Sequence, residues 1–289
     1  MQTKLAETAG FCFGVDRAVA LVEQAVREGK RVATLGPIIH NRHVIERFKT
    51  LGVREIAAPE EAAAGECVVI RSHGVSRAVM EALEKMGVEI VDATCPFVKK
   101  IHRIISAAAE NGQQPVIIGT RAHPEVQAIA GWCSAPLVFE SPEEFASWLA
   151  DDAKRTEIPI RMVCQTTSTQ NLWKKTCEIA KKECTNCEIF DTICKATEMR
   201  QKEATTLAKQ CDAMVVVGDA RSSNTGRLAD ICRQYCKHVA LVDSAAELDM
   251  LLLSNAKTVG ITAGASTPAW IIKEVNNKMS EEMKVETAM

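Results

Sequence analysis

Gly10-Phe11-Cys12-Phe13-Gly14 stands near the start of this 289-residue chain, and its pattern returns twice. The later copies are Asp92-Ala93-Thr94-Cys95-Pro96 and Asp191-Thr192-Ile193-Cys194. A stretch with the apolar spacing of a helix follows each cysteine, and then comes a short apolar run that ends in glycine. The spacing from cysteine to glycine is 24 residues each time: Cys12 to Gly36, Cys95 to Gly119 and Cys194 to Gly218. This repetition predicts three copies of one supersecondary unit packed side by side.

The strands expected from this repeat are short and apolar without alternation, as is typical of parallel strands covered by helices on both faces. They are Val32 to Leu35, Cys67 to Ile70, Val116 to Ile118, Met162 to Cys164, Met214 to Val217 and Thr258 to Ile261. Helices are expected after each cysteine and after the polar loop that follows each glycine. Alternating strands and helices predict an α/β fold with parallel sheets and right-handed crossovers.

The repeat also predicts the domain organisation. We expect three similar α/β domains over residues 13–94, 95–192 and 193–280, with residues 1–12 joining the third. The segment 2–6 is too short to form a domain and can add a strand to the third copy. Residues 281–289 read as a charged tail. If the three copies face a shared axis, three thiols and their polar loops converge on one central site.

The composition excludes several classes of protein. A net charge of −2 and 4% aromatic residues argue against nucleic-acid binding, which needs an extended basic face or stacking platforms. An apolar run near 18 residues and an N-terminal signal segment are both absent from the sequence. We therefore expect a soluble cytoplasmic protein that does not bind membranes.

The chain has twelve cysteines, and three of them hold matching positions in the repeat. Three convergent thiolates suit zinc or an iron–sulfur cluster rather than magnesium or calcium. Zinc requires a fourth protein ligand or an open catalytic position, whereas a four-iron cluster held by three cysteines leaves one iron open to substrate. The spacing alone does not separate these alternatives. Cys184 and Cys187 form a lone pair with the two-residue spacing of a metal or redox site.

Polar loops follow the glycines and the second strand of each copy. Their uncharged side chains are donors suited to a phosphate or diphosphate at helix N-termini, and a nucleotide-binding glycine motif is absent from the sequence. These candidates are His40, His73, His123, Thr166, Thr167, Ser222, Ser223, Asn224 and Ser266. Glu125 is the one carboxylate embedded among them. Buried beside an anion it would serve as a proton donor, or else it is a first-turn carboxylate favoured by the helix dipole.

Eight ordered motifs resemble the 4-hydroxy-3-methylbut-2-enyl diphosphate reductase (LytB) family over residues 2 to 280. They are Gly10-Phe11-Cys12-Phe13-Gly14-Val15, His40-Asn41-Arg42, Ser72-His73-Gly74-Val75, Asp92-Ala93-Thr94-Cys95-Pro96, His123-Pro124-Glu125-Val126, Gln165-Thr166-Thr167, Ser222-Ser223-Asn224 and Thr262-Ala263-Gly264-Ala265-Ser266. The resemblance implies a trefoil of three α/β domains around a central oxygen-sensitive [4Fe–4S] cluster, one per chain, with one iron not held by cysteine. Its ligands would be Cys12, Cys95 and Cys194.

The implied activity is the last step of the methylerythritol phosphate route to isoprenoids. Two electrons and two protons expel water from the allylic diphosphate and give isopentenyl or dimethylallyl diphosphate. Glu125 would relay protons, Thr166 would position the hydroxyl, and His123 would lie between the diphosphate and the acid. The remaining candidates, His40, His73, Ser222, Ser223, Asn224 and Ser266, would hold the diphosphate. Ferredoxin or flavodoxin would supply electrons.

Some features depart from the family pattern, and two other functions stay open. Ala122 replaces a glycine common before the histidine, the extra cysteines are not family ligands, and we expect no appended RNA-binding module. One alternative is an iron–sulfur or zinc redox sensor or binding protein without turnover. The other is a zinc-dependent hydrolase of a phosphorylated metabolite.

Overall fold

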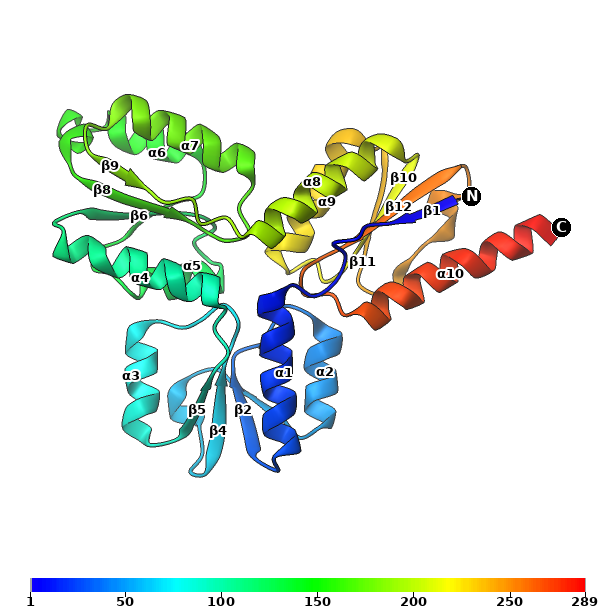
Figure 1. Ribbon diagram of the computed structural model, residues 1–289, viewed down its shortest axis with the longest axis horizontal. Helices are drawn as coiled ribbons and strands as arrows, with labels where there is room; N and C mark the ends of the chain where they lie inside the picture. The colour runs from blue at the N-terminus through cyan, green and yellow to red at the C-terminus, as the bar shows by residue number, and fades with distance from the viewer. Residues whose placement is uncertain (1, 289) are drawn as a thin grey trace. The chain divides into compact units, whose positions relative to one another are not determined.

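Three parallel sheets of four strands make up the described part of the chain, residues 2–288, in this computed structural model (Figure 1). Their strand orders are β3-β2-β4-β5, β7-β6-β8-β9 and β1-β12-β10-β11, and neighbouring strands run parallel throughout. The predicted α/β class with parallel sheets is therefore confirmed.

The two central strands of each sheet are the six predicted from the sequence. They are β2 (Arg31–Leu35), β4 (Glu66–Ile70), β6 (Gln114–Ile118), β8 (Ile160–Cys164), β10 (Ala213–Val217) and β12 (Thr258–Ala263). Most of their residues are buried, as expected for strands covered on both faces. The outer strands are β1 (Gln2–Leu5), β3 (Arg54–Ile56), β5 (Glu89–Asp92), β7 (Leu137–Phe139), β9 (Cys187–Ile189) and β11 (His238–Val242).

The N-terminal strand completes the repeat. β1 pairs in parallel with β12, with Gln2 opposite Thr258, so the strand expected from residues 2–6 belongs to the third sheet. In that sheet β1 occupies the place that β5 and β9 occupy in the other two. Each of these three strands precedes one of the repeated cysteines, Cys12, Cys95 or Cys194.

The helices also recur in threes. α1 (Phe13–Arg27), α4 (Pro96–Glu110) and α8 (Lys195–Gln210) follow the cysteines, and α2 (Arg42–Thr50), α5 (Pro124–Ala130) and α9 (Ser223–Tyr235) follow the first polar loops. α3 (Arg77–Met86), α7 (Gln170–Glu183) and α10 (Ala269–Ala288) follow the second loops, and α6 (Pro142–Ala150) lies between β7 and β8. Each central strand thus ends in a loop that leads into a helix.

Apolar cores lie on the faces of the sheets. Phe145 of α6 and Trp173 of α7 pack on one face of the second sheet, while Ile105 of α4 and Ile129 of α5 pack on the other. In the third sheet, α10 packs on one face and α8 and α9 on the other. Among the described residues, no helix is long and apolar enough to cross a lipid bilayer.

Contacts group the chain into two compact units. The first comprises Met1–Asp16, His40–Glu46 and Lys195–Met289, and the second comprises Arg17–Ile39 and Arg47–Cys194. The boundaries of three domains and their trefoil arrangement stay predictions. α10 continues through residues 281–288, which were expected to form a charged tail, and Met289 lies outside the described residues.

Candidate functional site

In the second unit, a series of contacts begins at Cys95, the residue that caps the N-terminus of α4. Its backbone N–H donates to the carbonyl of Ser72 at 2.9 Å. The residues before it are also held, because Arg17 donates to the carbonyls of Asp92 and Thr94 at 3.1 and 3.3 Å. The Cys95 loop is therefore fastened to the loop that follows β4.

That loop carries His73, whose ring meets the ring of His123 edge to face. Their centroids are 5.4 Å apart and the rings make an angle of 83°. His123 caps α5, and its Nδ1 accepts the backbone N–H of Glu125 at 3.1 Å. An imidazole whose Nδ1 accepts carries its proton on Nε2 when neutral. His123 can therefore donate a hydrogen bond from Nε2.

Glu125 lies in the first turn of α5 and is 3% exposed. Its two carboxylate oxygens accept hydrogen bonds from Thr166, one from the backbone N–H and one from Oγ1, each at 2.6 Å. Thr166 is itself buried, at 7% exposure. Both oxygens are thus fixed in direction, and the Thr166 hydroxyl is held next to a buried acid.

The series ends at Cys194, whose backbone N–H donates to the carbonyl of Thr166 at 3.0 Å. Gln165, which is fully buried, supports the same loop. Its Nε2 donates to Oγ1 of Thr167 at 2.9 Å, and its Oε1 accepts the backbone N–H of Thr120 at 3.1 Å. The Thr167 hydroxyl is therefore engaged by the fold rather than left to a ligand alone.

The first unit carries the third repeated cysteine. The backbone N–H of Cys12 donates to the carbonyl of Ala265 at 3.2 Å, which places Cys12 beside the loop after β12. That loop is anchored in turn by Thr267, whose Oγ1 donates to the carbonyl of Val217 at 2.9 Å. Cys12 is half-buried, as are Cys95 and Cys194.

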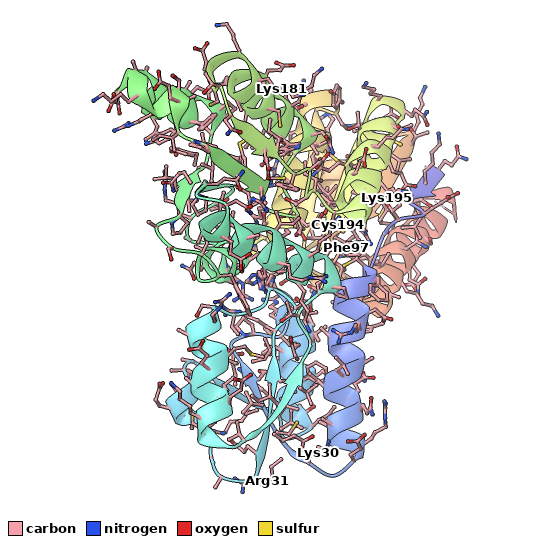
Figure 2. The ribbon with its side chains drawn as sticks, turned by 60° about the vertical axis from the view of Figure 1, so that its left-hand side comes forward. Lys30, Arg31, Phe97, Lys181, Cys194 and Lys195 are labelled. Carbon is pink, nitrogen blue, oxygen red and sulfur yellow. The ribbon has the colours of Figure 1, made fainter. Side chains whose placement is uncertain are left out.

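The loop before Cys12 is also tied to α8. Arg200 donates to the carbonyl of Gly10 at 2.7 Å. Glu203 accepts the backbone N–H groups of residues 7 and 8 at 2.7 and 3.0 Å. Cys194 immediately precedes Lys195, the first residue of α8 (Figure 2). The Cys12 loop is therefore fastened to the helix that Cys194 introduces.

Several buried polar atoms of the first unit lack hydrogen-bond partners among the described residues. Nδ2 and Oδ1 of Asn224 are in this state, and so is Oγ of Ser266, although the two residues are only 4% and 5% exposed. Ser222 caps α9 through a 3.4 Å bond from the Thr225 N–H to its Oγ. An unmet buried polar group costs about 1–3 kcal/mol, so the polar atoms of Asn224 and Ser266 are suited to pairing with a polar ligand.

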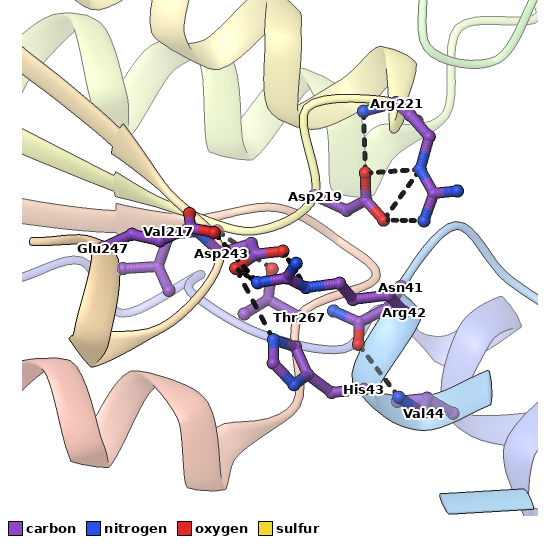
Figure 3. A network of polar contacts seen from close by, with 10 residues as sticks. All are labelled: Asn41, Arg42, His43, Val44, Val217, Asp219, Arg221, Asp243, Glu247 and Thr267. Carbon is purple, nitrogen blue, oxygen red and sulfur yellow. Dashed lines mark hydrogen bonds and ion pairs between the residues drawn. The ribbon is translucent and has the colours of Figure 1, made fainter. Parts of the chain in front are cut away.

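An ion-pair network holds the chain just after His40 (Figure 3). Nε of Arg42 lies 2.5 Å from Asp243 Oδ2, and Nη2 of the same guanidinium lies 2.9 Å from Glu247 Oε1. Oδ1 of Asn41 accepts the Val44 N–H at 3.1 Å and so caps α2. The His40-Asn41 turn is therefore anchored to the third sheet.

The predicted site residues thus fall into two sets, one in each unit. The second unit brings together His73, His123, Glu125, Thr166, Cys95 and Cys194, with Thr167 beside them. The first unit carries Cys12, His40, Ser222, Ser223, Asn224 and Ser266.

Several residues that were not predicted from the sequence to be functional support these two sets. Arg17, Gln165 and Arg200 each hold a loop from a distant part of the chain, and Arg42 anchors the His40 turn. Gln165 and Arg42 belong to two of the motifs quoted above, so their place in those motifs could have indicated that they support the site.

The other cysteines behave as core residues. Cys67, Cys164, Cys232 and Cys236 are buried, and Cys211 is half-buried against the core of the third sheet. Cys184 and Cys187 are half-buried against the core of the second sheet. Burial raises the pKa of Cys187 to about 12. A thiol with this pKa is a poor nucleophile at neutral pH, which disfavours a redox pair.

Comparisons with known proteins agree over nearly the whole chain. The model of a family described as LytB protein matches residues 3–280. Relatives from Caldanaerobacter subterraneus subsp. tengcongensis and Thermoanaerobacter pseudethanolicus, both named 4-hydroxy-3-methylbut-2-enyl diphosphate reductase, are 40% and 39% identical over 283 residues, or 96% of each chain.

Two solved structures are also similar. One is of (E)-4-hydroxy-3-methyl-but-2-enyl diphosphate reductase, described as the terminal enzyme of the non-mevalonate pathway, with a TM-score of 0.71 and 37% identity over 97% of this chain and 100% of that one. The other is the E-1-hydroxy-2-methyl-but-2-enyl-4-diphosphate reductase from Plasmodium falciparum, with a TM-score of 0.89 and 25% identity over 96% of this chain and 87% of that one.

Proposed function

The chain belongs to the LytB protein family, and we propose that it reduces (E)-4-hydroxy-3-methylbut-2-enyl diphosphate in the last step of the non-mevalonate route to isoprenoids. The allylic C–O bond breaks, two electrons and two protons are consumed, and water leaves with isopentenyl or dimethylallyl diphosphate as product. The observation that carries this proposal is the contact series from Cys95 through His73, His123, Glu125 and Thr166 to Cys194. This series links two cysteines, whose thiolates are soft metal ligands, to the buried carboxylate of Glu125.

The cysteines fit an iron–sulfur cluster. Cys12, Cys95 and Cys194 are half-buried and each immediately precedes a helix, where the positive end of the helix dipole stabilises a thiolate. We infer that they hold one [4Fe–4S] cluster per chain, in which one iron has no protein thiolate. When bound, this cluster would supply electrons and a Lewis-acidic iron to the substrate oxygen.

The diphosphate is assigned to the uncharged donors. Asn224 and Ser266 offer buried polar atoms that an anion would satisfy, and Ser222 and Ser223 stand at the N-terminus of α9. His40, His73 and Thr167 belong to the same group of donors, since they lie in the matching loops of the repeat. We infer that these groups bind the diphosphate through directed hydrogen bonds rather than through a basic patch.

The acid and its neighbours are assigned to proton delivery. Glu125 Oε2 accepts the hydrogen bond of Thr166 Oγ1, and we infer that a proton taken up by this carboxylate passes through the threonine hydroxyl to the substrate hydroxyl, which Thr166 also orients. His123 donates from Nε2, because its Nδ1 is occupied by the Glu125 N–H. Removing the proton path leaves the binding groups in place, so its effect is expected on turnover.

Electrons have to come from a partner, because the sequence contains no nicotinamide- or flavin-binding motif. We propose a small iron–sulfur or flavin electron carrier, ferredoxin or flavodoxin, in the cytoplasm.

The proposal is tested by two measurements on protein purified without oxygen. Iron, acid-labile sulfide and zinc are counted per chain, and turnover of the allylic diphosphate is followed with reduced methyl viologen. About four iron and four sulfide with turnover are expected for the cluster assigned above. Zinc without sulfide would overturn the reductase and favour a zinc-dependent hydrolase, and a loaded cluster without turnover would favour a redox sensor.

A further inference from the structure

A pocket of about 390 Å³ lies in the second unit, beside the loops that carry His73 and Cys95. This volume is within the range of small-molecule sites. The pocket is lined by Val75, Met80, Asp92, Thr94, Lys99, His102, Arg103 and Trp132. None of these residues has a role in the proposed reaction.

One wall of the pocket is aromatic and well supported. The ring of His102 stacks on that of Trp132, with centroids 5.0 Å apart and an interplanar angle of 15°. Nε1 of Trp132 donates to the carbonyl of Val75 at 2.8 Å, and the guanidinium of Arg77 lies 5.2 Å from the Trp132 centroid. Together with Met80, this wall offers a flat apolar surface of fixed position.

His102 lines the same pocket and carries an unmet polar atom. It is 5% exposed, and its Nε2 has no hydrogen-bond partner among the described residues. Burial lowers the pKa of His102 to about 4, so the ring is neutral at pH 7 and can donate one hydrogen bond. A buried group in this state is stabilised by a ligand that pairs with it.

The charges around the pocket favour an anion. Lys99 pairs with Asp92 at 2.6 Å, which neutralises both. The guanidinium of Arg103, an exposed residue, forms no ion pair with a described residue. A positive charge is therefore left over beside an apolar wall and a neutral donor.

We propose that this pocket is a second ligand site, separate from the proposed reaction centre, which binds a small amphipathic anion. Its phosphate or carboxylate head pairs with Arg103 and accepts from His102 Nε2, and its apolar body lies against Val75, Met80 and Trp132. The proposal does not depend on the identity of the reaction.

The test is isothermal titration calorimetry of the holoenzyme with octyl phosphate and with octanoate. Inorganic phosphate is titrated as well, because it is the head group without the apolar chain. Three variants are compared with the wild type. Arg103→Glu reverses the charge at the pocket, Lys100→Glu makes the same change on an exposed position of α4 outside it, and Met80→Trp fills the apolar part. A fourth, Ser266→Ala, alters the proposed diphosphate site.

We expect Arg103→Glu and Met80→Trp to weaken binding of an octyl ligand about tenfold or more, since each removes one half of the recognition. Lys100→Glu and Ser266→Ala should leave that binding event within about twofold. Tighter binding of octyl phosphate than octanoate assigns a phosphate head, and the reverse assigns a carboxylate. Equal weakening by the Arg103 and Lys100 variants, loss of all binding in Ser266→Ala, or no binding at millimolar ligand would overturn the proposal.

Discussion

Replacing Glu125 by glutamine separates its chemical role from its structural one. The amide oxygen can still accept the Thr166 N–H, and the amide nitrogen can donate to Thr166 Oγ1, so both hydrogen bonds of 2.6 Å keep a partner. Exchanging two charge-assisted bonds for neutral ones costs about 1 kcal/mol each, partly offset because a neutral group is easier to bury. The fold and cluster content should therefore persist, while loss of a general acid lowers kcat about 10²–10⁴-fold.

The assay is anaerobic turnover with reduced methyl viologen, beside iron and sulfide content and the urea midpoint. Glu143→Gln is the matched control, because Glu143 also follows the first proline of a helix, in α6, but is exposed. It should retain wild-type turnover. A cluster-loaded Glu125→Gln protein with kcat within about threefold of wild type would refute proton delivery by this residue. Glu125 would then be a first-turn carboxylate that holds the Thr166 loop.

Three further outcomes are expected. Arg42→Ala should raise KM about tenfold with a smaller effect on kcat, because it frees the turn that carries His40, a proposed diphosphate donor. Arg47→Ala, a change on the same helix, removes only a surface ion pair with Glu23 and should change neither constant. Gly264→Ala should lower the free energy of unfolding by about 1–3 kcal/mol, since its Cβ would lie 2.0 Å from Thr225 Oγ1, and a second change of that threonine to alanine should restore part of it in urea titrations. The pKa of His102 is about 4 in the folded protein and near the ordinary histidine value of about 6.5 in the unfolded chain, so the unfolded state binds more protons between these values and stability falls as the pH falls. From pH 7 to pH 5 this loss is about 2 kcal/mol, and His102→Phe should remove that part of the urea-midpoint shift.

The central strands could be predicted because each is a continuous apolar run that requires cover on both faces. β3, β7 and β9 could not, since each has three residues and their pairing is decided by the neighbouring strand rather than by their own pattern. α3 and α7 were also missed as elements, although Ser76 and Thr169 cap them with the side-chain bonds expected at helix starts.

The site was predicted at the level of residue types and motifs, and the contacts that join them were not. Glu125 and Thr166 are 41 residues apart in sequence, and their pairing follows from the register of β6 against β8, which no local pattern encodes. The same holds for Arg200, which reaches Gly10 across 190 positions. A repeat identifies which loops are equivalent, but the residue that fastens one loop to the next depends on side-chain length and direction.

β1 comes first in the sequence but belongs to the third sheet, where it pairs with β12. In each sheet an outer strand leads through a cysteine into the helix that enters the next sheet, and for the third sheet this outer strand is supplied by residues 2–5. The Cys12 N–H also bonds to the loop after β12. The pairing of β1 with β12 therefore holds the segment before Cys12 at the edge of the third sheet. β5 and β9 hold the segments before Cys95 and Cys194 in the same way, but they are continuous in sequence with the other strands of their sheets. Deleting residues 2–5 should consequently lower the iron and acid-labile sulfide measured per chain more than removing the outer strand β7, because of these two strands only β1 precedes a cysteine that we assign to the proposed cluster.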